Sequence, residues 1–161
     1  MTTQGFFLAC RQSEAPAFLR VLKALPKDRL DYRPDAHSRS AAELAWLLAC
    51  IETASAEMVD AGDVDWKETP PPASLDEIVA AYERRRAELD RRLDDLGDEA
   101  WQRKGKFRVG GDVVMEPPLG EFLWFLLFDS IHHRGQLSTY IRPMGGKVPS
   151  IYGPLANDTG S

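Results

Sequence analysis

Apolar residues recur every three or four positions along four stretches of the chain, a spacing typical of amphipathic helices. We expect helices over about residues 6–25, 41–61, 75–96 and 119–142. Pro16 interrupts the first stretch, so a kink or a restart of the helix is expected there. Four helices of this kind, each with an apolar stripe, predict a four-helix bundle.

Capping residues mark where two of these helices begin. Ser40 and Glu43 have the spacing of a capping box for the second helix, and Ser74 and Glu77 have it for the third. Gly62 is expected to end the second helix. Each capping box lies directly before the apolar stripe of its helix, so the capping residues and the apolar spacing predict the same helix start.

The sequence also predicts which faces of the first two helices are buried and a short insertion before the last helix. The first helix is expected to bury Phe6, Cys10 and Phe18, and the second to carry Leu47 close to the centre of its buried face. Residues 106–115 contain two short β-forming runs around a Gly-Gly-Asp turn, which predicts a small β-hairpin or an irregular loop. The predicted fold is all-α: a four-helix bundle with this insertion before the last helix, in one domain over residues 1–161.

Composition narrows the function classes. The net charge is −5, which argues against a nucleic-acid-binding domain because such domains carry a basic excess. Arginines cluster over residues 84–92 but alternate with acidic residues, which favours a solvated helix face with i,i+4 ion pairs over a nucleic-acid patch.

Cysteine usage and hydropathy bear on the compartment. The chain has two cysteines, Cys10 and Cys50, and shows no signal peptide, so a reducing cytoplasm is expected rather than a disulfide. No apolar run approaches the roughly 20 residues of a membrane span. The tail from Lys147 to Ser161 is rich in proline and glycine and is expected to lie over the surface.

The fourth helix carries the candidate chemistry. A helical wheel places Asp129 and His133 on one face, one turn apart, together with Gln136 and Tyr140. Two side chains at i,i+4 can converge on one point, as two ligands of a metal or as a carboxylate that orients an imidazole. A simple Asp–His hydrogen bond in a polar pocket is the alternative, because a buried carboxylate needs a partner.

The neighbours of this pair are expected to play other parts. His132 falls about 100° away from His133 on the wheel and should not share its site. Arg134 lies outside the same arc and could reach a pocket mouth or pair with an acidic neighbour. A second apolar set, Trp124, Phe128 and Ile131, lies opposite the expected core face, and we expect it to form a homodimer interface or to pack under the hairpin or the tail.

At these residues the chain resembles a known family. The run DSIHHRGQLSTYIRPMGGKVPSIYGP resembles the C-terminal signature of the DinB/YfiT-like superfamily of small bacterial four-helix proteins. The segment LPKDRLDYRPDAHSRSAAELAWLL resembles the junction between its first and second helices. The resemblance covers the whole chain in length and helix order.

The resemblance implies a left-handed bundle, commonly a homodimer, with a divalent metal held by three histidines near one end of the core. One histidine comes from the second helix and two from an H-x-x-x-H pair on the fourth. Characterised members of the superfamily include thiol-dependent S-transferases and isomerases that use bacillithiol or mycothiol.

Carried over by position, the metal pattern is incomplete in this chain. His133, followed by Arg-Gly-Gln, matches the second ligand of the last helix, and Asp129 stands where the first is expected. A carboxylate can still bind zinc, nickel or manganese. The histidine of the second helix is replaced by Leu47, which donates nothing.

Other side chains could complete such a site. Glu43 and Cys50 lie about one turn to either side of Leu47, and His37 precedes the second helix. Arg134, Gln136 and Tyr140 are candidates for the substrate pocket, together with Glu43 and Cys50. Two protein ligands alone bind a divalent ion weakly, since three or four is the usual complement.

Two functions remain open from the sequence. The first is a metal-dependent enzyme of the thiol S-transferase type with a degraded metal site, in which the metal produces a nucleophile at neutral pH. The second is a metal-free binding or interaction protein on the same scaffold, in which Asp129 and His133 pair in a polar pocket. A small molecule or thiol is the expected ligand, and the sequence names no substrate.

Overall fold

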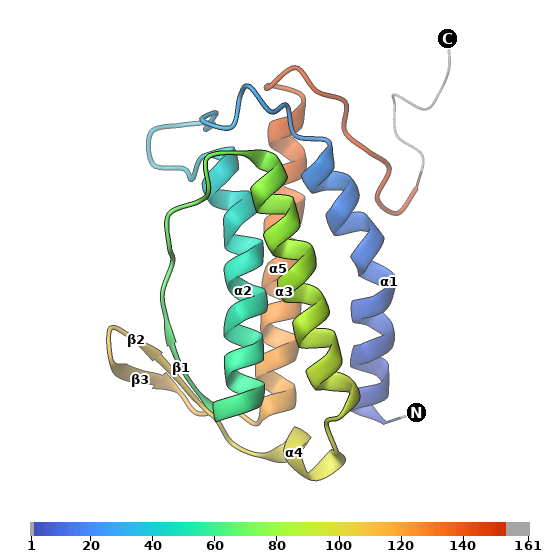
Figure 1. Ribbon diagram of the computed structural model, residues 1–161, viewed down its shortest axis with the longest axis vertical. Coiled ribbons are helices and arrows are strands. Elements are labelled where there is room, and N and C mark those ends of the chain that lie inside the picture. Colours follow the sequence, from blue (N-terminus) through green and yellow to red (C-terminus); the bar gives the residue numbers. More distant parts are fainter. Residues whose placement is uncertain (1, 154–161) are drawn as a thin grey trace.

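A computed structural model describes residues 2–153 of the 161-residue chain. Four long helices pack side by side: α1 (Thr3–Lys23), α2 (Ala41–Ala61), α3 (Leu75–Asp94) and α5 (Leu119–Ile141). Figure 1 shows that α1 and α5 run in one direction and α2 and α3 in the other. Neighbours along the chain are therefore not all antiparallel, and α2 and α3 need the long connection between them.

The predicted caps of α2 and α3 are confirmed. The Ser40 hydroxyl accepts a hydrogen bond from the Glu43 backbone N–H at 3.2 Å, and the Glu43 carboxylate accepts one from the Ser40 backbone N–H at 2.7 Å. Ser74 and Glu77 repeat this arrangement in α3. Gly62 ends α2 in the left-handed conformation, with φ of 68°, which glycine adopts without steric strain.

Helix α1 differs from expectation in two respects. It does not restart at Pro16 but is continuous from Thr3 to Lys23, because Pro16 lies on the exposed side of the helix and residues on both sides of it are held in the core. Phe6 is 55% exposed, whereas Phe7 is 1% exposed and belongs to the core. The helix is thus rotated by one residue from the face that the wheel predicted at its N-terminal end.

The predicted hairpin is confirmed as part of a small sheet. Strands β2 (Lys106–Val109) and β3 (Asp112–Met115) are antiparallel and turn at Gly110 and Gly111. A further strand, β1 (Asp63–Trp66), follows α2 and pairs in parallel with β2. Neither β1 nor the short helix α4 (Asp98–Gln102) was expected, so the all-α prediction holds for the long elements only.

The arginine-rich stretch of α3 is a solvated face with one exception. Arg92 pairs with Asp60 across the surface at 2.8 Å, and Arg84 is exposed, as expected. Arg86 is only 7% exposed, because it lies one turn after the buried Tyr82 and one turn before Leu89. The prediction of a wholly solvated face was wrong at this residue.

Arg86 belongs to a buried group of charges that joins three helices. Arg11 of α1 donates two hydrogen bonds to the Glu52 carboxylate of α2, at 3.1 and 2.6 Å, and one to Asp90 of α3 at 2.6 Å. Arg86 lies 3.8 Å from Glu52 and donates to the Arg11 carbonyl oxygen at 2.6 Å. The two positive and two negative charges balance, which allows them to lie between the helices.

The described part of the tail lies over the surface, as expected. Arg20 of α1 donates hydrogen bonds to the carbonyl oxygens of Ser150 and Ile151. The rest of the predicted tail, after residue 153, lies outside the described residues. Within residues 2–153, no helix is long and apolar enough to cross a membrane.

Candidate functional site

Asp129 and His133 form the expected pair on α5. The Nε2 atom of His133 lies 3.4 Å from Oδ1 of Asp129, and the two side chains are 14% and 37% exposed, respectively. The pair lies at the edge of the buried face of α5 rather than at its centre. It is therefore accessible to a ligand, yet held by its own helix.

A third side chain fixes the other ring nitrogen of His133. The Nδ1 atom lies 2.7 Å from the Oε1 atom of Gln136, three residues further along α5. Both ring nitrogens thus face oxygen acceptors, an arrangement that favours the doubly protonated imidazolium. When both nitrogens are protonated, His133 offers no lone pair to a metal and pairs with Asp129 as a cation; when only Nδ1 is protonated, the lone pair of Nε2 faces Asp129.

The pKa values of the pair move in the directions this geometry requires. The hydrogen bond to His133 lowers the pKa of Asp129, and burial opposes that change. The hydrogen bond from His133 to Asp129 raises the pKa of His133; burial opposes this and the contact with Gln136 adds to it. Arg39, directly before the N-cap of α2, lowers the pKa of both groups through its positive charge.

Replacing Asp129 by asparagine is expected to lower the pKa of His133, because the imidazolium loses its carboxylate partner. The pKa is measured from the ring-proton shifts of His133 during a pH titration by NMR, with the signal assigned from a His133→Gln variant. Replacing Asp98, an acidic residue at the start of α4, serves as the control. An unchanged His133 pKa in the Asp129 variant would show that the pair is not coupled.

The same shifts set the pH range in which the pair contributes to stability. The folded pKa of His133 lies above its ordinary 6.5, so its contribution is complete below that pH and is lost as the pH rises through the folded value. The folded pKa of Asp129 lies below its ordinary 3.8, so its contribution is lost as the pH falls through that lower value. The pair therefore stabilises the fold most between about pH 4 and 6.5.

The centre of the buried face of α5 differs from the prediction. It is occupied by Leu123, Leu127, Ser130, Arg134 and Leu137, whereas Gln136 is exposed. The wheel is right for Leu119, Phe122, Leu126, Leu137 and Tyr140, which are buried, and wrong for Gln136. It errs because α5 is apolar on several sides over residues 122–128, so hydrophobicity alone does not select one direction.

Arg134 accordingly does not line a pocket mouth. It is 2% exposed and forms an ion pair with Glu14 of α1, which confirms the alternative that it pairs with an acidic neighbour. Its guanidinium lies 4.7 Å from the ring centre of Phe18 and donates to the Tyr152 hydroxyl at 2.5 Å. Tyr152 in turn donates to Glu14 at 2.7 Å, so Arg134 joins α1, α5 and the tail.

The residues considered as a replacement third ligand have other partners. Glu43 caps α2 and lies 3.4 Å from Arg33. His37 lines an open pocket of about 640 Å³ that contains Glu43 but neither member of the Asp129–His133 pair.

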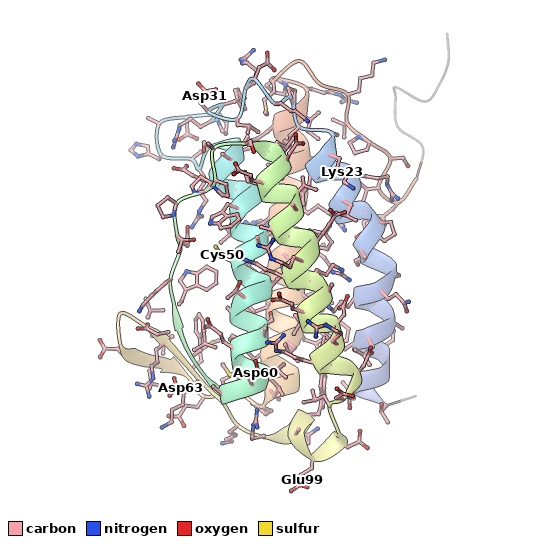
Figure 2. The ribbon with its side chains drawn as sticks, in the orientation of Figure 1. Lys23, Asp31, Cys50, Asp60, Asp63 and Glu99 are labelled. Atoms are coloured by element: carbon pink, nitrogen blue, oxygen red, sulfur yellow. The ribbon has the colours of Figure 1, made fainter. Side chains whose placement is uncertain are left out.

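On α2 itself, neither Leu47 nor Cys50 completes the pair. Leu47 is an ordinary core residue, 4% exposed, on a helix that packs against α5. Cys50 lies midway along α2 (Figure 2) and lines a pocket with Trp66 and Lys67 that does not include Asp129 or His133.

Tyr140 and Arg39 lie near the pair, and the sequence pointed to only one of them as a site residue. Tyr140, a pocket candidate, stacks edge-on against Tyr32 and donates a hydrogen bond to the Arg39 carbonyl oxygen at 3.2 Å. Arg39 itself was not singled out, although its position directly before a capping serine places it at a helix start. Its guanidinium is held by Glu68 at 2.6 Å.

The side chains present do not fit a three-ligand metal centre. Among the described residues, no group of three or more histidine, cysteine, aspartate or glutamate side chains is placed to hold a metal ion. Asp129 and His133 are the two members of the expected set that occur together, with His133 Nε2 facing Asp129 and Nδ1 facing Gln136. The geometry supports a fixed, partly exposed ion pair.

Comparisons with known proteins agree with this fold. The chain is 26% identical over 158 residues to the uncharacterized protein YrdA of Bacillus subtilis, covering 97% of this chain and 92% of YrdA. Its structure resembles a DinB-like protein from Bacillus cereus, with a TM-score of 0.73, 21% identity and coverage of 91% and 95% of the two chains.

A more distant likeness concerns the fold alone. The mycothiol-dependent maleylpyruvate isomerase matches with a TM-score of 0.51 and 15% identity, over 94% of this chain and 68% of the isomerase. The model of the DinB family matches residues 1–160, which is nearly the full length of this chain. The chain therefore belongs to the DinB family.

Proposed function

We propose that this DinB-family protein acts by binding, without a metal ion, and that the Asp129–His133 pair forms part of its ligand site. The observation that carries the proposal is the arrangement of His133, whose two ring nitrogens face Asp129 and Gln136. The pair is partly exposed and adjacent to the cationic start of α2 at Arg39. It can therefore offer a polar ligand a carboxylate and an imidazolium, beside an Arg39 guanidinium that is paired with Glu68.

The buried Leu47 supports the same proposal. A ligand position filled by a 4%-exposed leucine is part of the hydrophobic core, where its burial stabilises the fold by about 2 kcal/mol. Asp129 and His133 supply two ligands, fewer than the three or four protein ligands that a zinc site usually has. Cys10 and Cys50 are both free, which agrees with action in a reducing cytoplasm.

Metal analysis of protein purified without an affinity tag tests the proposal. After incubation with zinc, nickel or manganese and removal of the excess, we expect no stoichiometric metal by mass spectrometry. Stoichiometric metal that disappears in a His133→Ala variant would overturn the metal-free proposal.

A metal-dependent enzyme of the thiol S-transferase type is the second candidate. The i,i+4 pair of Asp129 and His133 favours it, because both side chains already lie on one patch of α5. The fold likeness to a mycothiol-dependent isomerase agrees with it. A divalent ion bound by this pair would take the lone pair of Nε2, the ring nitrogen that faces Asp129, while the Nδ1 N–H keeps its contact with Gln136. The resulting change in the ring-proton signals of His133 is observable by NMR.

We also propose that the protein is a homodimer through the aromatic surface of α1 and α5. Phe128 is 61% exposed, stacks on Trp124 at 5.3 Å between ring centres, and Trp124 lies 5.7 Å from the exposed Phe6. Within residues 2–153, neither the hairpin nor the tail covers Phe128. Exposed aromatic groups of this kind are typical of protein interfaces.

Replacing Phe128 by glutamate is expected to weaken dimerisation on the order of 100-fold or more, because a charge would enter an apolar contact on both subunits. Sedimentation velocity over a range of concentrations measures the fraction of dimer relative to the 18.0-kDa monomer. Val114→Lys changes a comparably exposed apolar residue on β3 and serves as the control. A wild-type protein that stays monomeric at all concentrations would remove the proposal.

A further inference from the structure

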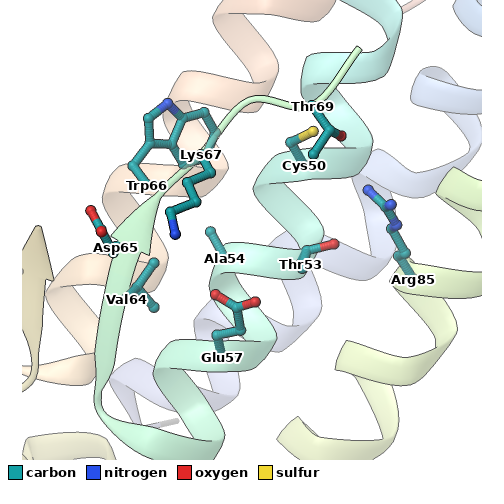
Figure 3. A pocket seen from close by; sticks show the side chains of 10 residues that line it. All are labelled: Cys50, Thr53, Ala54, Glu57, Val64, Asp65, Trp66, Lys67, Thr69 and Arg85. Carbon is teal, nitrogen blue, oxygen red and sulfur yellow. The ribbon is translucent and has the colours of Figure 1, made fainter. Parts of the chain in front are cut away.

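A second pocket lies between α2 and the segment that follows it. Its volume is about 360 Å³, near the lower end of the range for small-molecule sites. Figure 3 shows α2 on one side, with Cys50 and Thr53, and β1 with its continuation on the other, with Lys67 and Thr69. Arg85 reaches the pocket from α3. The pocket shares no lining residue with the Asp129–His133 pair.

The walls of this pocket are fixed by contacts outside it. Val64 of β1 is 2% exposed and pairs with Phe107 of β2, which holds the strand against α2. Further along, the Trp46 indole N–H donates a hydrogen bond to the Thr69 hydroxyl at 2.9 Å. Both ends of the covering segment are therefore anchored, and the pocket is formed before a ligand binds.

Two cations of the pocket have no anionic partner. Lys67 and Arg85 form no ion pair or hydrogen bond with any of the residues 2–153, whereas the nearby Arg39, Arg92 and Arg108 are each paired with a carboxylate. The Arg85 guanidinium lies 4.4 Å from the ring centre of Trp46, which holds it in one orientation. A pre-oriented guanidinium is well suited to bind a carboxylate.

One anion faces these cations. The Glu57 carboxylate points into the pocket toward Lys67 (Figure 3), and the two form no ion pair. The other acidic residue of the lining, Asp65, alternates with Val64 along β1 and accepts a hydrogen bond from the Gly111 backbone N–H at 3.3 Å. Its carboxylate is thus engaged with the hairpin. The groups left for a ligand are two cations and one carboxylate.

We propose that this pocket binds a small acidic amino acid. Two ligand carboxylates would face Lys67 and Arg85, one ammonium group would face Glu57, and the short methylene stem would lie against Ala54 and Trp66. A ligand of this class carries two negative charges and one positive charge, the complement of the three free groups. The site is independent of the proposed function, since it involves neither Asp129 nor His133.

Protection of Cys50 tests this proposal, because its thiol forms part of the pocket wall. In a Cys10→Ser background, iodoacetamide labelling of Cys50 is followed by intact mass with and without L-glutamate at constant ionic strength. Labelling is expected to slow about tenfold at about ten times the Kd, since the free fraction falls as 1/(1 + [L]/Kd). If Cys50 does not react in the free protein, the amide shifts of Thr53 and Thr69 by NMR give the Kd instead.

Two ligand controls and two variants make the test specific. Glutarate lacks the ammonium group and L-glutamine lacks one carboxylate, so each is expected to bind about tenfold more weakly or worse. Arg85→Ala is expected to weaken L-glutamate binding to a similar extent, whereas Arg84→Ala, the exposed neighbour on α3, leaves it unchanged. Equal effects of all three ligands, no binding of L-glutamate, or full binding by Arg85→Ala would overturn the proposal.

Discussion

Replacing Glu52 by glutamine is expected to lower the free energy of unfolding by about 3–5 kcal/mol, the usual effect of removing one partner from a buried ion pair. Glu52 is 4% exposed and receives two hydrogen bonds from Arg11, with Arg86 at 3.8 Å. Glutamine keeps the volume of the side chain, so no cavity forms. The loss arises because two buried guanidinium groups then share only Asp90, whose side chain is 45% exposed.

The pKa of Arg11 supports this expectation. Burial disfavours the charge on Arg11, but the attraction and hydrogen bonds of Glu52 and Asp90 outweigh burial and raise its pKa. Because an arginine guanidinium is not deprotonated in proteins, Arg11 stays charged in the variant and cannot compensate for the loss of Glu52 by releasing a proton. The nearby Tyr82 has a raised pKa because of burial and the charge of Glu52, so it remains neutral and cannot replace the carboxylate.

Chemical denaturation of the wild type and the variant measures this effect. Glu57→Gln is the matched control, since Glu57 lies on the same helix, is exposed and forms no ion pair with residues 2–153. The control is expected to change stability by less than about 0.5 kcal/mol. A Glu52→Gln variant as stable as the control would mean that the buried charges do not join α1, α2 and α3 as described.

Replacing Leu47 by histidine is expected to create a metal site. Zinc binding in four-ligand sites amounts to about 10–16 kcal/mol, or roughly 3 kcal/mol per ligand. One added imidazole should therefore tighten zinc binding by about 100-fold. Leu47 lies on α2, which packs against α5, and the family resemblance of the sequence implies a histidine at this position.

A Leu47→Asn variant separates the imidazole from the loss of an apolar residue. Both variants place a polar group at a 4%-exposed position, so both are expected to be less stable than the wild type. Isothermal titration with zinc is expected to show tight binding for the histidine variant alone. Equal zinc affinity of the two variants would mean that residue 47 does not face Asp129 and His133.

The sequence predicted those parts of the fold that rest on local patterns. The capping boxes at Ser40 and Ser74 and the turn at Gly110 depend on residues within a few positions of one another. Strand β1 was not predicted, because its four residues pair with β2, some 40 positions later in the chain, and a short run such as DVDW has no distinct period. The pocket between α2 and β1 depends on this strand, and so it was not predicted either.

The buried charges were missed for a related reason. Arg11, Glu52 and Arg86 each lie on an otherwise apolar helix face. In the sequence of one helix, such a charged residue only interrupts the apolar stripe. Their burial is explained only by their contacts with one another, and Arg11 is separated from Glu52 by 41 positions and from Arg86 by 75. A charged residue at a core position of one helix is a signal to look for the opposite charge at a core position of another.

The candidate site was predictable in part. The contact of Asp129 with His133 follows from i,i+4 spacing, and the absence of a histidine at Leu47 is visible in the sequence. The exposure of the pair was not predictable, because α5 is apolar on several sides and its neighbours decide which side is buried. For the same reason the burial of Arg134 against Phe18 was not predicted, although its pairing with an acidic neighbour, Glu14, was one of the two expected roles.

The most direct test of a metal-free site is to follow the His133 ring protons by NMR while zinc is added to the untagged wild-type protein near pH 7. We expect both ring signals of His133 to stay unchanged at one equivalent of zinc, with the contacts to Asp129 and Gln136 preserved. A stoichiometric shift or loss of these signals, absent in an Asp129→Ala variant, would show that the pair binds a metal and would contradict the metal-free proposal.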